Sequence, residues 1–246
     1  LFNHAGQSLA DAQTAKYDRL LQALQVKPGD HILEIGCGWG ALAERAVERH
    51  DVLYTGITLS PAQAQIAEAR LRITDLTDRS RIELCDYRDA RGPYDAIASV
   101  EMVEAVGQAY WPAYLDAIAR LLRPGGRAAI QYILISDALF ERYAASTDFI
   151  QAYIFPGGCL ISESRFRSLA EERGLAWRDV RHFGSGYAET LRQWRERFDA
   201  AAAAGQLPAG FDDRFVRLWR YYLQYCEGGF RGGGIDVAQV TLEKRY

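Results

Sequence analysis

The sequence predicts an α/β protein built on a doubly wound, mostly parallel sheet with helices on both faces. Two observations predict this fold class. Short apolar runs alternate with amphipathic segments from residue 31 to residue 133, and the first apolar run ends in a glycine cluster at 36–40. Strands that alternate with helices pair in parallel, because each helix carries the chain back across the sheet. The 246 residues are enough for one well-buried domain and contain no long linker, so we expect a single domain over 1–246.

Local signals mark the ends of the expected elements. Pro28-Gly29 ends the first helix of an N-terminal segment 1–28, and Pro61 begins a later helix. The run Arg123-Pro124-Gly125-Gly126 ends another. Short apolar runs bounded by glycines or charges are typical of buried strands. In chain order we expect a helix at 9–25, a strand at 31–36, a helix at 41–50, a strand at 52–57, a helix at 61–71, strands at 81–85 and 94–100, a helix at 109–122 and a strand at 127–133.

Residues 134–230 are expected to add helices to this sheet. The pattern predicts a helical insertion at 135–155 that carries aromatic side chains, and two further helices at 188–204 and 212–226. A strand at 236–244 would return to the sheet. Helical additions over the carboxyl edge of the strands would form a deep apolar pocket, although the same aromatics could fill an ordinary core.

Composition argues against several classes of protein. The net charge of -3 argues against nucleic-acid binding, which needs a positive surface. The four cysteines form no metal-binding spacing, so we expect reduced thiols, no metal and a cytoplasmic location. No apolar run approaches the ~20 residues that cross a bilayer, and no signal peptide is present. A membrane surface stays open as a partner, because local patches decide such contacts.

The glycine cluster predicts a site for a nucleotide-like cofactor. Glycines at 36, 38 and 40 form G-x-G-x-G between a strand and a helix, whereas pyrophosphate is bound by G-x-G-x-x-G. The acid Glu34 precedes them, and the second strand ends in Thr58-Leu59-Ser60, without the acid that binds an NAD ribose. Asp86 and Tyr87 stand where an adenine ring could stack and be hydrogen-bonded. Together these features favour S-adenosylmethionine over NAD or FAD.

With these motifs in place, the chain resembles the cyclopropane fatty acid synthase family, which includes the mycolic acid cyclopropane synthases. The match is colinear and runs nearly end to end, and its most specific parts are Trp39 in the glycine loop, the run Tyr153-Ile154-Phe155-Pro156-Gly157-Gly158 and the segment around Cys226. The resemblance implies a class I methyltransferase with a Rossmann-like, seven-stranded sheet. The residues it implies for cofactor binding are Glu34, Gly36, Cys37, Gly38, Trp39, Gly40, Thr58, Leu59, Ser60, Gln63, Asp86, Tyr87 and Arg88.

The resemblance also implies the chemistry. A methyl or methylene group would pass from S-adenosylmethionine to the double bond of an unsaturated phospholipid acyl chain. An alkene is a weak nucleophile, so it must be held in line with the sulfonium methyl group in a dry pocket. Transfer leaves a carbocation, and a base must then remove a proton to close a cyclopropane ring. In this family the implied base is a bound bicarbonate.

The residues implied to hold this bicarbonate are Glu104, Tyr187, the backbone of Ile133, and Gln131 where the family has a histidine. Ala105 is a second departure, because a Glu-His pair is common at 104–105. A glutamine still donates a hydrogen bond to an anion but has no titratable proton, which leaves a ring, a methyl branch or a methylene branch open as products. Cys226, long suspected as a nucleophile, is expected to line the site from an apolar helix face.

Two other functions stay open at this point. One is a small-molecule methyltransferase on the same scaffold, for instance with an amine substrate, and the other is a non-catalytic lipid- or cofactor-binding module. Glu104 and Tyr187 argue against the second. We expect a peripheral protein at the inner membrane face, with a homodimer as one oligomeric state. Family members usually begin with a helical segment that covers the cofactor, so we expect the N-terminal segment to be truncated here.

Overall fold

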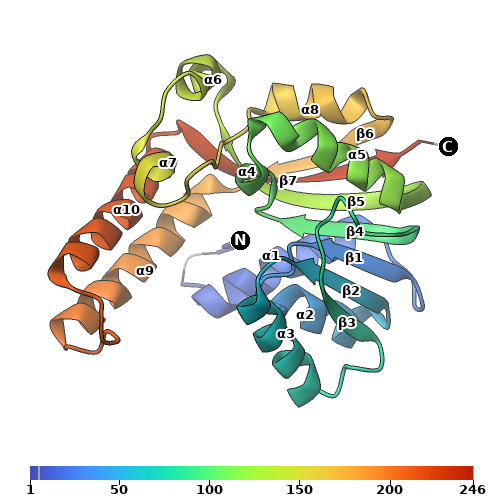
Figure 1. The fold of residues 1–246 in the computed structure, drawn as a ribbon, viewed down its shortest axis with the longest axis horizontal. Coiled ribbons are helices and arrows are strands. Elements are labelled where there is room, and N and C mark those ends of the chain that lie inside the picture. The colour runs from blue at the N-terminus through green and yellow to red at the C-terminus, as the bar shows by residue number, and fades with distance from the viewer. Residues whose placement is uncertain (5, 246) are drawn as a thin grey trace.

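The computed structural model describes residues 1–4 and 6–245, and its centre is a seven-stranded sheet in the order β3-β2-β1-β4-β5-β7-β6 (Figure 1). The first five strands pair in parallel, whereas β7 runs antiparallel to both of its neighbours. The chain order turns back at β1, and such a switch point opens a crevice at the carboxyl ends of the strands. The predicted doubly wound, mostly parallel fold is confirmed. The strands are β1 (His31–Ile35), β2 (Leu53–Thr58), β3 (Ser80–Leu84), β4 (Tyr94–Val100), β5 (Leu122–Ile135), β6 (Leu175–His182) and β7 (Ile235–Lys244).

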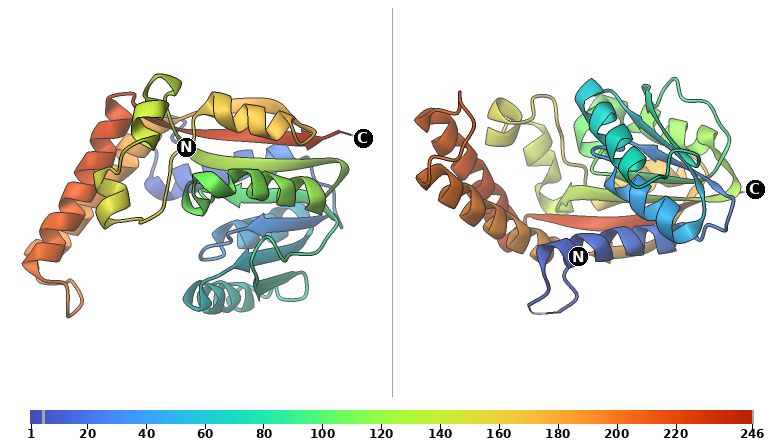
Figure 2. Two further views of the ribbon diagram at one scale, coloured as in Figure 1. Left: turned by 45° about the horizontal axis from the view of Figure 1, so that its top comes forward. Right: turned by 90° about the horizontal axis from the view of Figure 1, so that it is seen from below.

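Helices cover both faces of the sheet (Figure 2). Neighbouring strand residues point to opposite faces, so Ile32 packs with Leu20 and Leu42 of the first two helices, and Leu33 packs in the cluster of Trp111 and Phe166. Removal of these apolar side chains from water holds the layers together. One face carries α1 (Leu9–Leu24), α2 (Ala41–His50) and α3 (Pro61–Ile73), and the other carries α4 (Val103–Val106), the 3-10 turn η1 (Gln108–Tyr110), α5 (Trp111–Leu121) and α8 (Glu163–Glu171).

The remaining helices lie beyond the carboxyl ends of the parallel strands, on the left of Figure 1. They are α6 (Asp137–Ala144), α7 (Phe149–Tyr153), α9 (Gly184–Ala203) and α10 (Asp213–Arg231). α9 and α10 pack along each other and onto β7 through an apolar cluster that includes Leu191, Leu223 and Val237. The expected helical additions are thus present at the expected edge. Within the described residues, no helix combines the length and the apolarity needed to cross a membrane.

The structure departs from the predicted elements mainly in the second half. β6 and α8 have no counterpart in the sequence prediction, because β6 is an edge strand and is buried only at its start, Leu175 and Ala176. β5 begins at Leu122 instead of 127, since Leu122 already pairs with Tyr94 of β4. Helix α9 begins at Gly184, so Tyr187 lies in its first turn and not in the loop before it.

Candidate active site

A cleft of about 650 Å³ opens at the carboxyl ends of β1, β2 and β4. Gly36 and Gly38 form one wall, and both have positive φ angles, of 80° and 51°. A Cβ atom at Gly36 would overlap the side chain of Met102, so only glycine lets the loop approach the next strand end this closely. Most of the residues predicted to bind the cofactor line this cleft: Gly36, Gly38, Thr58, Leu59, Ser60, Gln63, Asp86, Tyr87 and Arg88.

Hydrogen bonds hold the polar side chains of the cleft in place. The Thr58 hydroxyl donates to Gln63 Oε1 at 2.9 Å, and the Ser60 Oγ accepts from the Gln63 amide and caps α3. Since its oxygen is occupied, Gln63 presents its NH2 group as a donor. On the opposite side Arg88 donates to Asp86 at 2.6 and 2.9 Å, and these bonds lower the pKa of the Asp86 carboxyl.

Glu34, predicted to contact the cofactor, does not line the cleft. It is buried beneath the glycine loop, where the Tyr54 hydroxyl donates to its Oε2 at 2.7 Å. Burial raises the pKa of Glu34 to about 7, although the hydrogen bond from Tyr54 and the charge of Lys16 act in the other direction. In this structure the Glu34 side chain is therefore held by Tyr54 of β2, and its contact with a cofactor stays a prediction.

Three further residues of the predicted cofactor set also lie outside the cleft. Cys37 is buried against Gly56, Trp39 is 52% exposed, and Gly40 precedes α2 with a φ of 81°. These positions shape the loop and its junction with the helices. Direct contacts of these three residues with a cofactor stay predictions.

A cluster of polar side chains adjoins the cleft where β4, β5 and α9 meet. Glu101 directly follows β4, lines the cleft and has a φ of 55°, which is rare for a residue other than glycine. Its Oε1 accepts hydrogen bonds from Gln131 Nε2 at 2.7 Å and from the Tyr187 hydroxyl. Gln131 Nε2 also donates to the Tyr187 oxygen at 2.7 Å. Glu101 is not among the residues predicted from the sequence, although an acid at the end of a strand beside the switch point is itself a signal.

Glu104 contacts β5 at Ile133, two residues after Gln131. Its Oε1 accepts a hydrogen bond from the Ile133 amide, and its Oε2 is shielded from solvent without a partner among the described residues. Burial and then the neighbouring Glu101 raise the pKa of Glu104 to about 8, because both oppose its negative form. Glu104 is therefore mostly protonated at neutral pH. Glu104 and Tyr187 thus contact β5 two residues apart, at Ile133 and Gln131, and their catalytic roles stay predictions.

Gln131 is oriented by a second glutamine behind it. Gln131 and Gln239 face each other in the β5–β7 ladder, and Gln239 Nε2 donates to Gln131 Oε1 at 2.9 Å. The same NH2 group donates to the Lys16 carbonyl at 3.0 Å, while Arg19 donates to Gln239 Oε1 at 3.0 Å. With its oxygen turned towards Gln239, Gln131 directs both N–H groups at Glu101 and Tyr187.

The groups predicted to hold bicarbonate do not form an open anion site. Gln131 gives its two hydrogens to Glu101 and Tyr187, Tyr187 gives its hydrogen to Glu101, and the Ile133 amide donates to Glu104. Each donor already has an acceptor within the protein. A bound bicarbonate does not fit this arrangement.

Cys226 lies on α10, in an apolar cluster with Tyr187 and Phe230, and is not among the residues that line the cleft. Burial raises the pKa of its thiol to about 12. The nucleophile of cysteine chemistry is the thiolate, so this thiol is poorly suited to attack. Its position supports a packing role.

The strand order with β7 antiparallel between β5 and β6, together with the glycine loop and the cleft at the switch point, is the arrangement of the class I, S-adenosylmethionine-dependent methyltransferases. Within that class the chain belongs to the family described as mycolic acid cyclopropane synthetase, which matches residues 1–240. The family uses S-adenosylmethionine, so the predicted cofactor and family are confirmed.

Individual relatives agree with this family. The chain is 45% identical over 235 residues to tuberculostearic acid methyltransferase UfaA1 of Mycobacterium tuberculosis, which covers 95% of this chain and 55% of that protein. It is 36% identical over 238 residues to the cyclopropane-fatty-acyl-phospholipid synthase of Escherichia coli K12, which covers 96% and 59%. The chain thus spans little more than half the length of these two relatives.

Solved structures have the same fold. The crystal structure of mycolic acid cyclopropane synthase CmaA1 complexed with SAH and CTAB superposes with a TM-score of 0.90 at 31% identity, over 99% of this chain and 88% of that chain. The cyclopropane synthase MmaA2 from Mycobacterium tuberculosis also gives a TM-score of 0.90, at 27% identity, over 99% and 88%.

Proposed function

We propose that this chain transfers a methyl or methylene group from S-adenosylmethionine to the double bond of an unsaturated phospholipid acyl chain. One observation carries the proposal: Glu101 belongs both to the wall of the cofactor cleft and to the hydrogen-bonded cluster with Gln131 and Tyr187. Proton-accepting groups therefore adjoin the place where the methyl donor would bind. The names of UfaA1 and of the Escherichia coli synthase support a fatty acyl substrate.

The cleft fits S-adenosylmethionine. The backbone around Gly36 and Gly38 can approach a ligand closely, Gln63 offers an amide NH2 group, and Asp86 and Tyr87 offer a carboxylate and an aromatic ring. We assign these residues to hold the cofactor. When bound, it supplies an electrophilic methyl group on a sulfonium.

The apolar part of the cleft lining suits an alkene. It includes Val100, Met102, Val106 and Tyr110. An apolar wall excludes water, which would otherwise compete for a carbocation. We propose that this wall holds the reacting part of the acyl chain.

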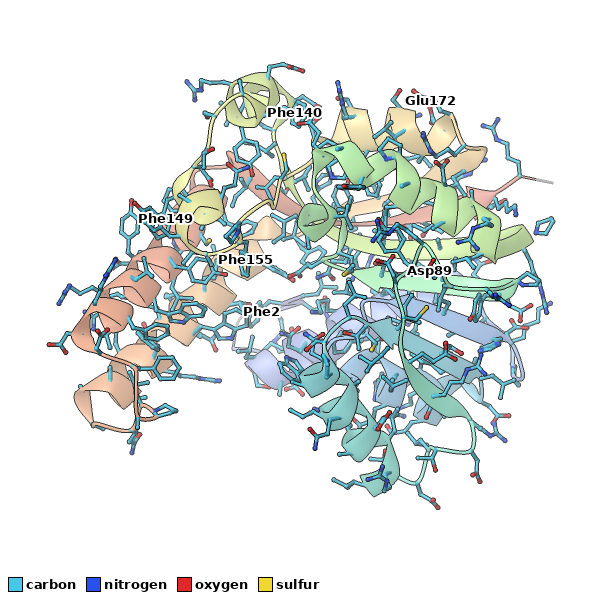
Figure 3. All side chains as sticks on the ribbon, viewed as in Figure 1. Phe2, Asp89, Phe140, Phe149, Phe155 and Glu172 are labelled. Carbon is cyan, nitrogen blue, oxygen red and sulfur yellow. The ribbon has the colours of Figure 1, made fainter. Side chains whose placement is uncertain are left out.

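The aromatic residues of α7 and α10 would hold the rest of the acyl chain. The Phe149 ring lies 4.6 Å from that of Tyr221 and the Phe155 ring lies 6.1 Å from that of Tyr222, and Figure 3 shows both phenylalanines beside α10. CTAB, which is present in the CmaA1 structure, is a detergent with a long alkyl chain, and this supports an alkyl-binding site in the fold.

We further propose that the protein attaches peripherally to the membrane that holds its substrate. Four aromatic side chains at this end of the molecule are between 40% and 66% exposed. They are Tyr153 of α7, Phe155 just after α7, and Tyr221 and Tyr225 of α10. Exposed aromatic patches of this kind suit the interface between lipid head groups and acyl chains.

Light scattering during size-exclusion chromatography tests the homodimer that is expected from the sequence.

Mass spectrometry of lipids tests the proposed reaction. Purified protein, S-adenosylmethionine and vesicles of unsaturated phospholipid should give acyl chains heavier by one CH2 group. Loss of alkene reactivity at this mass then identifies a ring, and its retention identifies a methylene branch or a methyl-branched alkene. Gly36→Val is the matched negative control, because its side chain would overlap Met102 and fill the cleft. The proposal fails if the natural chain binds the cofactor by calorimetry but alters no lipid.

A further inference from the structure

We propose that the carboxylate of Glu101 is the base of this reaction and takes the place of a bound bicarbonate. The inference rests on the proposed function and deepens it. It follows from the donors of the site: the groups that would hold an external anion already hold the side chain of Glu101.

The two oxygens of Glu101 have different surroundings. Oε1 accepts from both Gln131 and Tyr187, which fixes the carboxylate in position. Oε2 accepts no hydrogen bond from the described residues, and Glu101 lines the cofactor cleft. One oxygen is therefore anchored and the other is free to take a proton, as general base catalysis requires.

The backbone at Glu101 is unfavourable for a glutamate. A φ of 55° disfavours any residue with a Cβ atom, and glycine is the residue that adopts it freely. Strain of this kind is concentrated at functional sites, where the side chain is needed. Since glycine adopts this φ without strain, the backbone at this position should keep its conformation in a Glu101→Gly variant.

Glu104 is not placed to act as the base. It does not line the cleft, and its Oε1 is held by the Ile133 amide. Burial and then the neighbouring Glu101 also raise its pKa to about 8, which favours the neutral carboxyl, a much weaker base than a carboxylate. A neutral Glu104 also avoids a second negative charge beside Glu101. The buried Lys16 ammonium is close enough to interact with both Glu101 and Glu34.

The proton and the electrons balance with Glu101 alone. Once the methyl group has joined one alkene carbon, Glu101 Oε2 takes a proton from the alkylated chain. If the proton comes from the new methyl group, the electron pair of that C–H bond closes the second C–C bond of a ring. If a hydride first moves from the methylated carbon to the neighbouring cationic carbon, the same electron pair forms the C=C bond of a methylene branch. Glu101 becomes a neutral carboxyl group and returns its proton to water after the product leaves.

Removal and replacement of bicarbonate test the proposal. The natural chain should keep its turnover within about twofold in buffer freed of carbon dioxide. Glu101→Gly should lose about 100-fold or more, which is the usual contribution of a general base, and added bicarbonate or formate should restore part of it. Glu101→Gln should lose as much and not be restored, because the amide fills the same space. Glu48→Gln, at an exposed carboxylate on α2, is the matched control and should keep full turnover.

Binding gives a second measurement that does not depend on turnover. Nuclear magnetic resonance with [13C]bicarbonate should detect binding to Glu101→Gly but not to the natural chain or Glu101→Gln. Retained turnover in Glu101→Gln, or a natural chain that binds bicarbonate and stops without it, would overturn the proposal. If the proposed function itself fails, no lipid changes in any buffer, yet the bicarbonate measurement still shows whether Glu101 fills the anion position.

Discussion

Glu104 is expected to make the free energy of unfolding depend on pH. Its pKa is raised from 4.5 to about 8, so the folded protein keeps a proton that the unfolded chain releases at much lower pH. The free energy of unfolding therefore falls as the pH rises from about 5 towards 8, and levels off above that. Glu34, with a pKa of about 7, acts in the same direction over the lower part of this range.

We predict that Glu104→Gln weakens this pH dependence. The variant has no proton to release at this position, so its free energy of unfolding should fall less steeply between pH 5 and 8. The slope of the variant should be smaller than that of the natural chain by up to about 1.4 kcal/mol per pH unit. Urea unfolding at four pH values measures the slopes. Glu48→Gln should follow the natural chain. Equal slopes in Glu104→Gln and the natural chain would show that Glu104 is not a buried, protonated carboxyl.

Site residues can be predicted from the sequence when their place in the cleft follows from the strand that they end or follow. Gly36, Thr58 and Tyr87 each stand at or just after a strand end, so the parallel sheet alone brings them to one edge. The role of Glu101 could not be predicted in this way. Its hydrogen bonds depend on Gln131 and Tyr187, which reach it from β5 and α9, and sequence spacing does not fix such distant contacts.

Strand β7 shows how an element orients a distant side chain. It enters antiparallel between β5 and β6, and this register sets Gln239 directly opposite Gln131. Gln239 is itself held by Arg19 and by the Lys16 carbonyl of α1. The sequence predicts the strand at 236–244 but not its partners, because pairing is decided by the packing of the whole sheet.

We predict that Gln239→Leu lowers turnover without weakening cofactor binding. The substitution frees the Gln131 amide to turn away from Glu101, so kcat should fall about tenfold, while the affinity for S-adenosylmethionine by calorimetry stays the same. Two buried oxygens lose their donor, which should destabilise the fold by about 1–3 kcal/mol.

Thr241→Val is the control on the same strand. The Thr241 hydroxyl is buried without a partner among the described residues, so its loss should leave turnover unchanged and stability equal or higher. If both variants lose turnover alike, β7 acts through general packing and not through the orientation of Gln131.

In the whole molecule, the aromatic residues of α7 and α10 lie at the same end of the sheet as the cofactor cleft. α7, α9 and α10 lie beyond the carboxyl ends of the parallel strands, and the end of β7 lies at the opposite side (Figure 1). The sequence predicts these helices and their aromatic character. It does not show which rings stay exposed, because exposure depends on how α7 packs against α10.

We predict that the exposed rings at this end attach the protein to membranes. The double variant Tyr153→Ser, Phe155→Ser removes rings that are 66% and 55% exposed, so binding to phospholipid vesicles in a sedimentation assay should weaken about tenfold. Its affinity for S-adenosylmethionine, measured by calorimetry, should stay the same, because neither residue lines the cofactor cleft. Ile73→Ser is the matched control, since Ile73 is 85% exposed at the end of α3, away from α7 and α10. Equal loss of vesicle binding in Ile73→Ser and the double variant would mean that attachment follows general surface hydrophobicity, and the proposed membrane-facing end would then be wrong.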